Sequence, residues 1–179
     1  MPEPGPEPWS KATFYRHGQE LLDSKAFNEL LALIWDALPR LQYPPGLSVE
    51  LLETYVQAGK TTEIEAAAWR LFPNSPDPGQ IAWAAAERMD EAEPGALRLA
   101  RIATVLAPTE PVAIARLTAC LDAGGELRAA LRNVRRHEVL VGKPGALTAR
   151  LASATWTRKR WESAAVWFGR LIALVPDHL

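Results

Sequence analysis

One apolar signature recurs five times along this chain of 179 residues. In each copy an apolar residue is followed four positions later by a second one, which places both on the same face of a helix. The five pairs are Leu30/Ile34, Ile64/Ala68, Ala96/Ala100, Ala130/Val134 and Ala164/Phe168. Their first members lie 34, 32, 34 and 34 residues apart. Such a period is typical of stacked helical hairpins, because one hairpin is too small to bury its own apolar face.

Prolines follow these pairs at a nearly constant distance. Pro76, Pro108 and Pro176 each come twelve residues after the first member of a pair, and Pro44 and Pro144 come two residues later than that. Proline cannot donate a backbone hydrogen bond inside a helix, so each one marks the end of a second helix. The sequence therefore predicts an all-α solenoid of about five helical hairpins.

The turn residues divide the chain into two parts. Residues 1–10 are acidic and rich in proline, and we expect a flexible or polyproline-like arm there. Residues 11–179 form the predicted repeat domain, in which each hairpin is broken by a turn such as Gly59 or Gly124-Gly125. The predicted helix pairs are 11–23 with 26–38, 48–58 with 62–72, 79–89 with 95–107, 111–123 with 126–141, and 146–157 with 161–175.

The residue types argue against catalysis. The three histidines are His17, His137 and His178, which fall in separate segments and match no metal-binding or catalytic spacing. Cys120 is the only cysteine and lies in an alanine-rich and leucine-rich helix, where we expect a small buried residue rather than a reactive thiol. We expect no enzyme activity, no cofactor and no metal.

No apolar run approaches the roughly 20 residues that a membrane span needs, and the acidic N-terminus does not resemble a signal peptide. The sequence therefore predicts a cytoplasmic protein without a membrane span.

Charge is unevenly distributed. Residues 1–125 hold 10 Lys and Arg against 17 Asp and Glu, whereas residues 126–179 hold 10 against 4. Either the outer surfaces of these two parts simply differ in the sign of their net charge, or the basic part contacts an acidic partner or nucleic acid. The basic cluster consists of Arg132, Arg135, Arg136, His137 and the run Arg158-Lys159-Arg160-Trp161. Because that run falls in a predicted turn, where solvated charge is ordinary, nucleic-acid binding is disfavoured.

The repeat resembles the tetratricopeptide repeat family. The third copy matches its motif with Trp83-Ala84, Ala96, Ala100, Ala103 and Pro108. The first-helix aromatic is missing in two copies, where Glu87 and Thr155 stand instead, so a looser helical-repeat relative is the alternative. The resemblance implies a right-handed α-α superhelix whose first helices line a concave groove.

The same resemblance implies a function and a set of groove residues. It implies a protein-interaction scaffold that binds a peptide or a helix of a partner protein. The residues expected to line the groove are Tyr15, Gln19, Glu53, Gln57, Ile81, Arg88, Met89, Asp122 and Trp156. The Lys and Asn residues of relatives that hold chaperone C-termini do not recur here, which disfavours a chaperone adaptor.

Three tryptophans are given roles by the motif. Trp83 and Trp161 occupy motif positions that are normally core, so we expect both to be packed. Trp156 is either a groove anchor or a residue packed between repeats.

The last predicted helix carries two apolar stripes. Trp167, Leu171 and Leu174 form one, and Phe168, Ile172 and Val175 form the other. We expect the preceding helix to cover the second stripe and the first to stay exposed as an association surface. Either a homodimer covers it, or the chain is the non-catalytic N-terminal module of a larger bacterial enzyme, such as a glycosyltransferase or sulfotransferase.

Overall fold

The computed structural model describes residues 10–143 and 145–174, and this part is helical without strands. The proposed proline arm, apart from Ser10, lies outside the described residues, as do Pro144, Val175, Pro176 and His178. The helices are α1 (Lys11–Asp23), α2 (Phe27–Arg40), α3 (Pro45–Gln57), α4 (Ile64–Leu71), α5 (Pro78–Glu87), α6 (Pro94–Leu106), α7 (Pro111–Ala123), α8 (Leu127–Val141), α9 (Ala146–Thr157) and α10 (Trp161–Leu174). Short 3-10 segments, η1 (Thr61–Glu63) and η2 (Phe72–Asn74), flank α4.

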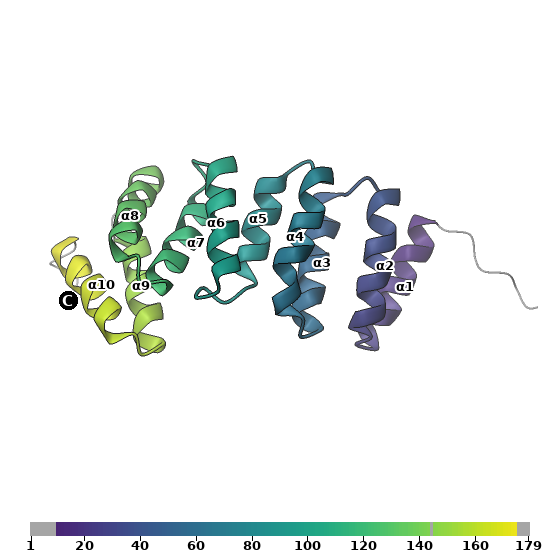
Figure 1. Cartoon of the computed structure of the whole chain (residues 1–179), viewed down its shortest axis with the longest axis horizontal. Coiled ribbons are helices and arrows are strands. Elements are labelled where there is room, and N and C mark those ends of the chain that lie inside the picture. Colours follow the sequence, from purple (N-terminus) through teal and green to yellow (C-terminus); the bar gives the residue numbers. More distant parts are fainter. Residues whose placement is uncertain (1–9, 144, 175–179) are drawn as a thin grey trace, which may run out of the picture.

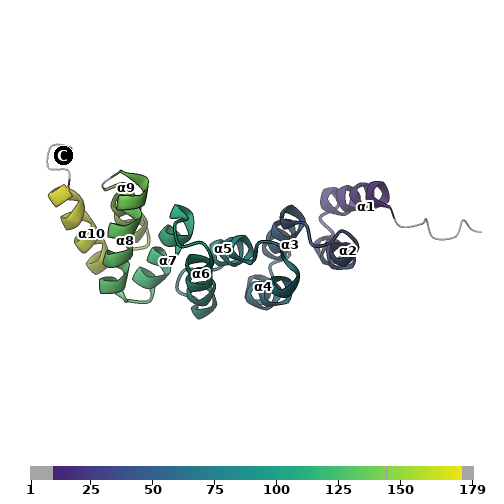
Figure 2. The same cartoon turned by 90° about the horizontal axis from the view of Figure 1, so that it is seen from above.

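These helices form five antiparallel hairpins stacked along one axis (Figure 1). Seen from above, the first helices of the hairpins lie on one side of the stack and the second helices α2, α4 and α6 on the other (Figure 2). The row of first helices curves inward, so the odd-numbered helices make the concave face (Figure 2). The predicted all-α superhelix of five hairpins is confirmed.

Turn chemistry explains where the hairpins fold back. Four of the five turns within hairpins contain one residue with positive φ, namely Lys25, Gly59, Gly125 or Lys159. This left-handed conformation ends a helix and satisfies its last carbonyl groups. Glycine adopts it without steric cost, whereas the two lysines carry a Cβ that makes it less favourable.

The apolar pairs that define the repeat form the core. Nine of their ten members are buried, and the exception is Phe168, whose side chain is 38% exposed. In each earlier hairpin the equivalent residue is covered, whereas within the described residues no hairpin follows α10. The apolar pairs therefore form a buried core along nearly the whole stack.

None of the described helices is both long enough and apolar enough to cross a membrane.

Candidate partner-binding groove

The nine predicted groove residues differ in how exposed they are in the structure. Tyr15, Gln19, Glu53, Gln57 and Trp156 are exposed on first helices. Arg88 is half-buried, because its guanidinium donates to the Glu53 carboxylate at 2.9 Å and to the Ala84 carbonyl at 2.8 Å.

Three of the nine are buried, so their predicted exposure in a groove is wrong. Ile81 and Met89 belong to the core of α5 and its end. The reason is the run Ala84 to Ala86, whose small side chains let α3, α4, α6 and α7 pack closely against α5. Asp122 is also buried, and it is held there by hydrogen bonds.

Asp122 anchors the last hairpin to the one before it. One carboxylate oxygen accepts a hydrogen bond from the Trp167 indole at 3.0 Å, and the other lies 3.0 Å from the Arg160 guanidinium. Arg160 also donates to the Asp122 carbonyl oxygen. The prediction that Trp167 is exposed is wrong, because this acceptor draws the indole inward and the ring is completely buried.

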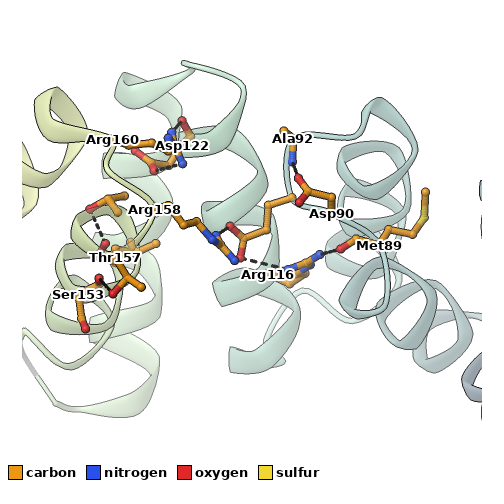
Figure 3. Close-up of polar contacts among 12 residues, drawn as sticks. Met89, Asp90, Ala92, Arg116, Asp122, Ser153, Thr157, Arg158 and Arg160 are labelled. Atoms are coloured by element: carbon orange, nitrogen blue, oxygen red, sulfur yellow. Dashed lines mark hydrogen bonds and ion pairs between the residues drawn. The ribbon is translucent and has the colours of Figure 1, made fainter. Parts of the chain in front are cut away.

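Arg116 performs a similar role one hairpin earlier (Figure 3). Its guanidinium donates to the carbonyl oxygens of Ala86 at 2.5 Å and Met89 at 2.6 Å, at the C-terminal end of α5. A cation is favourable at that end of a helix. Glu91 lies 3.2 Å from Arg116 and also pairs with Arg158. The third, fourth and fifth hairpins are thus joined through one carboxylate.

A third polar cluster lies between α8, α9 and α10. The buried Glu138 carboxylate accepts hydrogen bonds from the Thr148 hydroxyl at 2.8 Å and the Gly145 amide at 3.2 Å. It also pairs with Arg170 at 2.8 Å. Each oxygen of the carboxylate therefore has a partner, which a buried charge requires.

A hollow of about 170 Å³ opens on the concave face between α5, α7 and α9. Its floor is apolar and is made by Ala115, Ala119, Leu147, Leu151 and Ala154. Its polar lining consists of Glu87, Glu91, Arg116 and Arg150. Glu91 and Arg116 pair with each other, whereas the exposed Glu87 and Arg150 offer charges of opposite sign to a ligand. Sequence reasoning missed these residues, because their approach depends on how α7 and α9 are spaced.

Similar solved structures share this arrangement of helices. MamA from Desulfovibrio magneticus superposes with a TM-score of 0.60 at 12% identity, over 93% of this chain and 96% of that one. A thermophilic TPR protein of Thermus thermophilus gives a TM-score of 0.54 at 15% identity, over 94% and 93% of the two chains. The chain has a tetratricopeptide repeat fold. No protein-family model and no curated protein sequence matches it.

The stack of hairpins ends in an exposed aromatic cluster of Trp156, Trp161 and Phe168. The ring centroids of Trp156 and Trp161 lie 5.0 Å apart, those of Trp156 and Phe168 lie 6.1 Å apart, and both pairs meet edge to face. Trp161 is 54% exposed, so its predicted place in the core is wrong, whereas Trp83 is partly buried and packs against the core.

The predicted exposure of the two stripes on α10 is also reversed at the centre of this helix. Trp167 is buried, Leu171 is half-buried, and Leu174 is exposed. Phe168 and Ile172, which were expected to be covered, are exposed. The apolar surface at this end of the stack is therefore the aromatic cluster with Ile172, and not the predicted stripe.

The predicted basic cluster is split by the fold. His137 is buried, Arg158 and Arg160 pair with acids of earlier repeats, and Arg136 donates to the Pro108 carbonyl. Burial lowers the pKa of His137, and the charge of Arg150 lowers it further.

Chemically reactive groups are few in the described part of the chain. There, no three His, Cys, Asp or Glu side chains gather closely enough to hold a metal ion. Burial raises the pKa of the Cys120 thiol, which favours the unreactive protonated form.

Proposed function

We propose that this protein is an interaction scaffold that binds a peptide or a helix of a partner protein on its concave face. The observation that carries the proposal is the hollow between α5, α7 and α9, with its apolar floor and the exposed Glu87 and Arg150 in its lining. Alanines in the floor allow a partner backbone to approach closely, and the leucines provide apolar contact. The tetratricopeptide repeat fold is a common architecture for such binding.

The internal ion pairs reduce the number of charged side chains that a partner can contact. Because Glu91 pairs with both Arg116 and Arg158, the guanidinium groups of these arginines are engaged within the stack. A bound segment would meet the floor with an apolar side chain and would place a basic group near Glu87 and an acidic group near Arg150.

A peptide library displayed on phage tests this proposal. Selected peptides should bind the unmodified chain and lose at least about tenfold in affinity on Ala119→Trp, since the large ring fills the hollow. Ala66→Trp is the matched control, because Ala66 is exposed on the outer helix α4. Peptides that bind Ala119→Trp as well as they bind the control would refute the groove, provided that both variants melt as the unmodified chain does.

A second surface favours self-association. Trp156, Trp161, Phe168 and Ile172 expose adjoining apolar groups at the last hairpin, and exposed apolar patches of this kind often mark interfaces. We propose that a second copy of the chain covers them.

A further inference from the structure

Outer helix α8 has an unusual exposed face. Its exposed residues are Arg128, Arg132, Arg135, Arg136, Val139 and Leu140. All of its exposed polar side chains are therefore arginines, and they are followed at the C-terminal end by two apolar residues.

The same pattern occurs on the preceding outer helix, α6, in repeat register. Arg98 and Arg132, Arg101 and Arg135, Val105 and Val139, and Leu106 and Leu140 are each 34 residues apart. Val139 is 82% exposed and Val105 is 77% exposed, more than any other large apolar side chain of the described residues. The most exposed apolar groups thus occupy one equivalent position in two neighbouring repeats.

The two helices differ in whether acidic side chains neutralise the positive charge of their arginines. On α6, Arg98 makes two hydrogen bonds of 2.7 Å to Glu65, and Arg101 pairs with Glu126 at 3.1 Å. Of the four exposed arginines of α8, Arg136 alone has a partner among the described residues, the carbonyl of Pro108.

Within the described residues, Arg128, Arg132 and Arg135 make no ion pair or hydrogen bond. The one acid of α8, Glu138, is buried and paired with Arg170. The outer surface of α8 therefore carries uncompensated positive charge.

The apolar residues gather along one edge of the stack. The C-terminal ends of α6 and α8 lie on the same edge, uppermost in Figure 1. The exposed Val112 lies in the first turn of α7, the helix that follows α6. The edge thus presents valine and leucine side chains next to a row of arginines.

We propose that this edge docks on the surface of an anionic lipid bilayer. The valines and leucines enter the boundary between headgroups and acyl chains, and the arginines of α8 contact lipid phosphates. Arginine suits this role because its guanidinium can bind a phosphate with two parallel hydrogen bonds.

The α6 residues distinguish a bilayer from other anionic partners. A nucleic acid or an acidic protein segment would be attracted to α8 by charge, but it gains little from Val105 and Leu106, whose neighbouring arginines are already neutralised by Glu65 and Glu126. A bilayer is a flat apolar boundary and would accept both valine-leucine pairs together. The apolar edge and the charge are therefore explained by one partner.

Vesicle co-sedimentation of the full chain tests the proposal. We expect binding to vesicles of phosphatidylcholine with phosphatidylglycerol and at least about tenfold weaker binding to phosphatidylcholine alone. Substituting Arg128, Arg132 and Arg135 by Gln should weaken binding at least about tenfold. Its charge-matched control is Lys11→Gln with Lys25→Gln and Lys60→Gln, which should bind as the unmodified chain does.

A separate variant tests how much the apolar side chains of the edge contribute to vesicle binding. Replacing Val105, Leu106, Val139 and Leu140 by Ser should weaken vesicle binding with little effect on folding, because all four side chains are exposed. Tyr15→Ser with Leu22→Ser, at exposed positions of α1, is the control.

Two results would overturn the proposal. One is no binding to the anionic vesicles, whether or not a short oligonucleotide or polyglutamate binds. The other is equal loss in the edge variants and their controls.

Discussion

Asp122 is the residue whose role the structure defines most clearly. Its carboxylate accepts from the Trp167 indole and pairs with Arg160, and all of these contacts cross from the fourth hairpin to the fifth. A buried carboxylate without such partners would be strongly destabilising.

Asp122→Ala is therefore expected to lower the free energy of unfolding by about 2–4 kcal/mol, because it leaves the indole N–H and the guanidinium without their acceptor. Asp122→Asn keeps an oxygen for Trp167 and should cost less. Urea titration followed by tryptophan fluorescence measures both. Equal losses for the two variants would show that the indole hydrogen bond contributes nothing.

His137 gives a pH dependence of known sign. Burial and Arg150 lower its pKa in the folded state, although Glu138 opposes them, so folding favours the neutral ring. In the unfolded chain the His137 imidazole takes up a proton near the ordinary histidine pKa of about 6.5. The contribution to stability is thus fully present above that pH and is lost as the pH falls toward the folded-state pKa.

His137→Leu should accordingly show a smaller loss of melting temperature between about pH 7 and about pH 5 than the unmodified chain. Ala32→Leu is the control, because Ala32 is exposed and has no titratable side chain. A His137→Leu profile that parallels the unmodified one would contradict the role of His137.

At the scale of the element, α9 and α10 depend on a polar connection to α8. Glu138→Ala removes the acceptor for the Thr148 hydroxyl, the Gly145 amide and the Arg170 guanidinium. We expect a loss of about 2–4 kcal/mol that appears mainly in the last hairpin, because the three partners of Glu138 lie in or next to that hairpin. Hydrogen exchange should accelerate in α9 and α10 and stay nearly unchanged in α1 to α4. Uniform acceleration would mean that the stack unfolds as one cooperative unit.

For the whole molecule, variants at the end of the stack test the proposed association between copies. Trp167→Asp is expected to destabilise the fold by about 4 kcal/mol or more, because it places a carboxylate beside Asp122 and removes a fully buried ring. Phe168→Asp should cost only about 1 kcal/mol, since the side chain is partly exposed.

The same pair of variants tests self-association by sedimentation. We expect the unmodified chain to form dimers or larger species and Phe168→Asp to be a folded monomer. A monomer at high concentration for the unmodified chain would eliminate the aromatic cluster as a contact between copies.

Sequence alone determined the features that depend on short stretches of chain. The apolar pairs at spacing four, the prolines that follow them and the turn glycines specify where helices begin, end and fold back. The number of hairpins and the burial of residues such as Ile64 and Val134 follow from that pattern. These features need no knowledge of distant residues, because the repeat encodes each contact with the next hairpin.

Only the tertiary structure decided which apolar stripe of α10 faces inward. Both stripes are equally apolar, so local pattern cannot rank them, and the choice depends on Asp122, 45 residues before Trp167. The burial of α5 likewise depends on the alanines that let four other helices approach it. The arginine of each long-range pair has several acids within similar sequence distance. Packing selects its partner, because a hydrogen bond requires two atoms at about 3 Å and no periodicity specifies that distance.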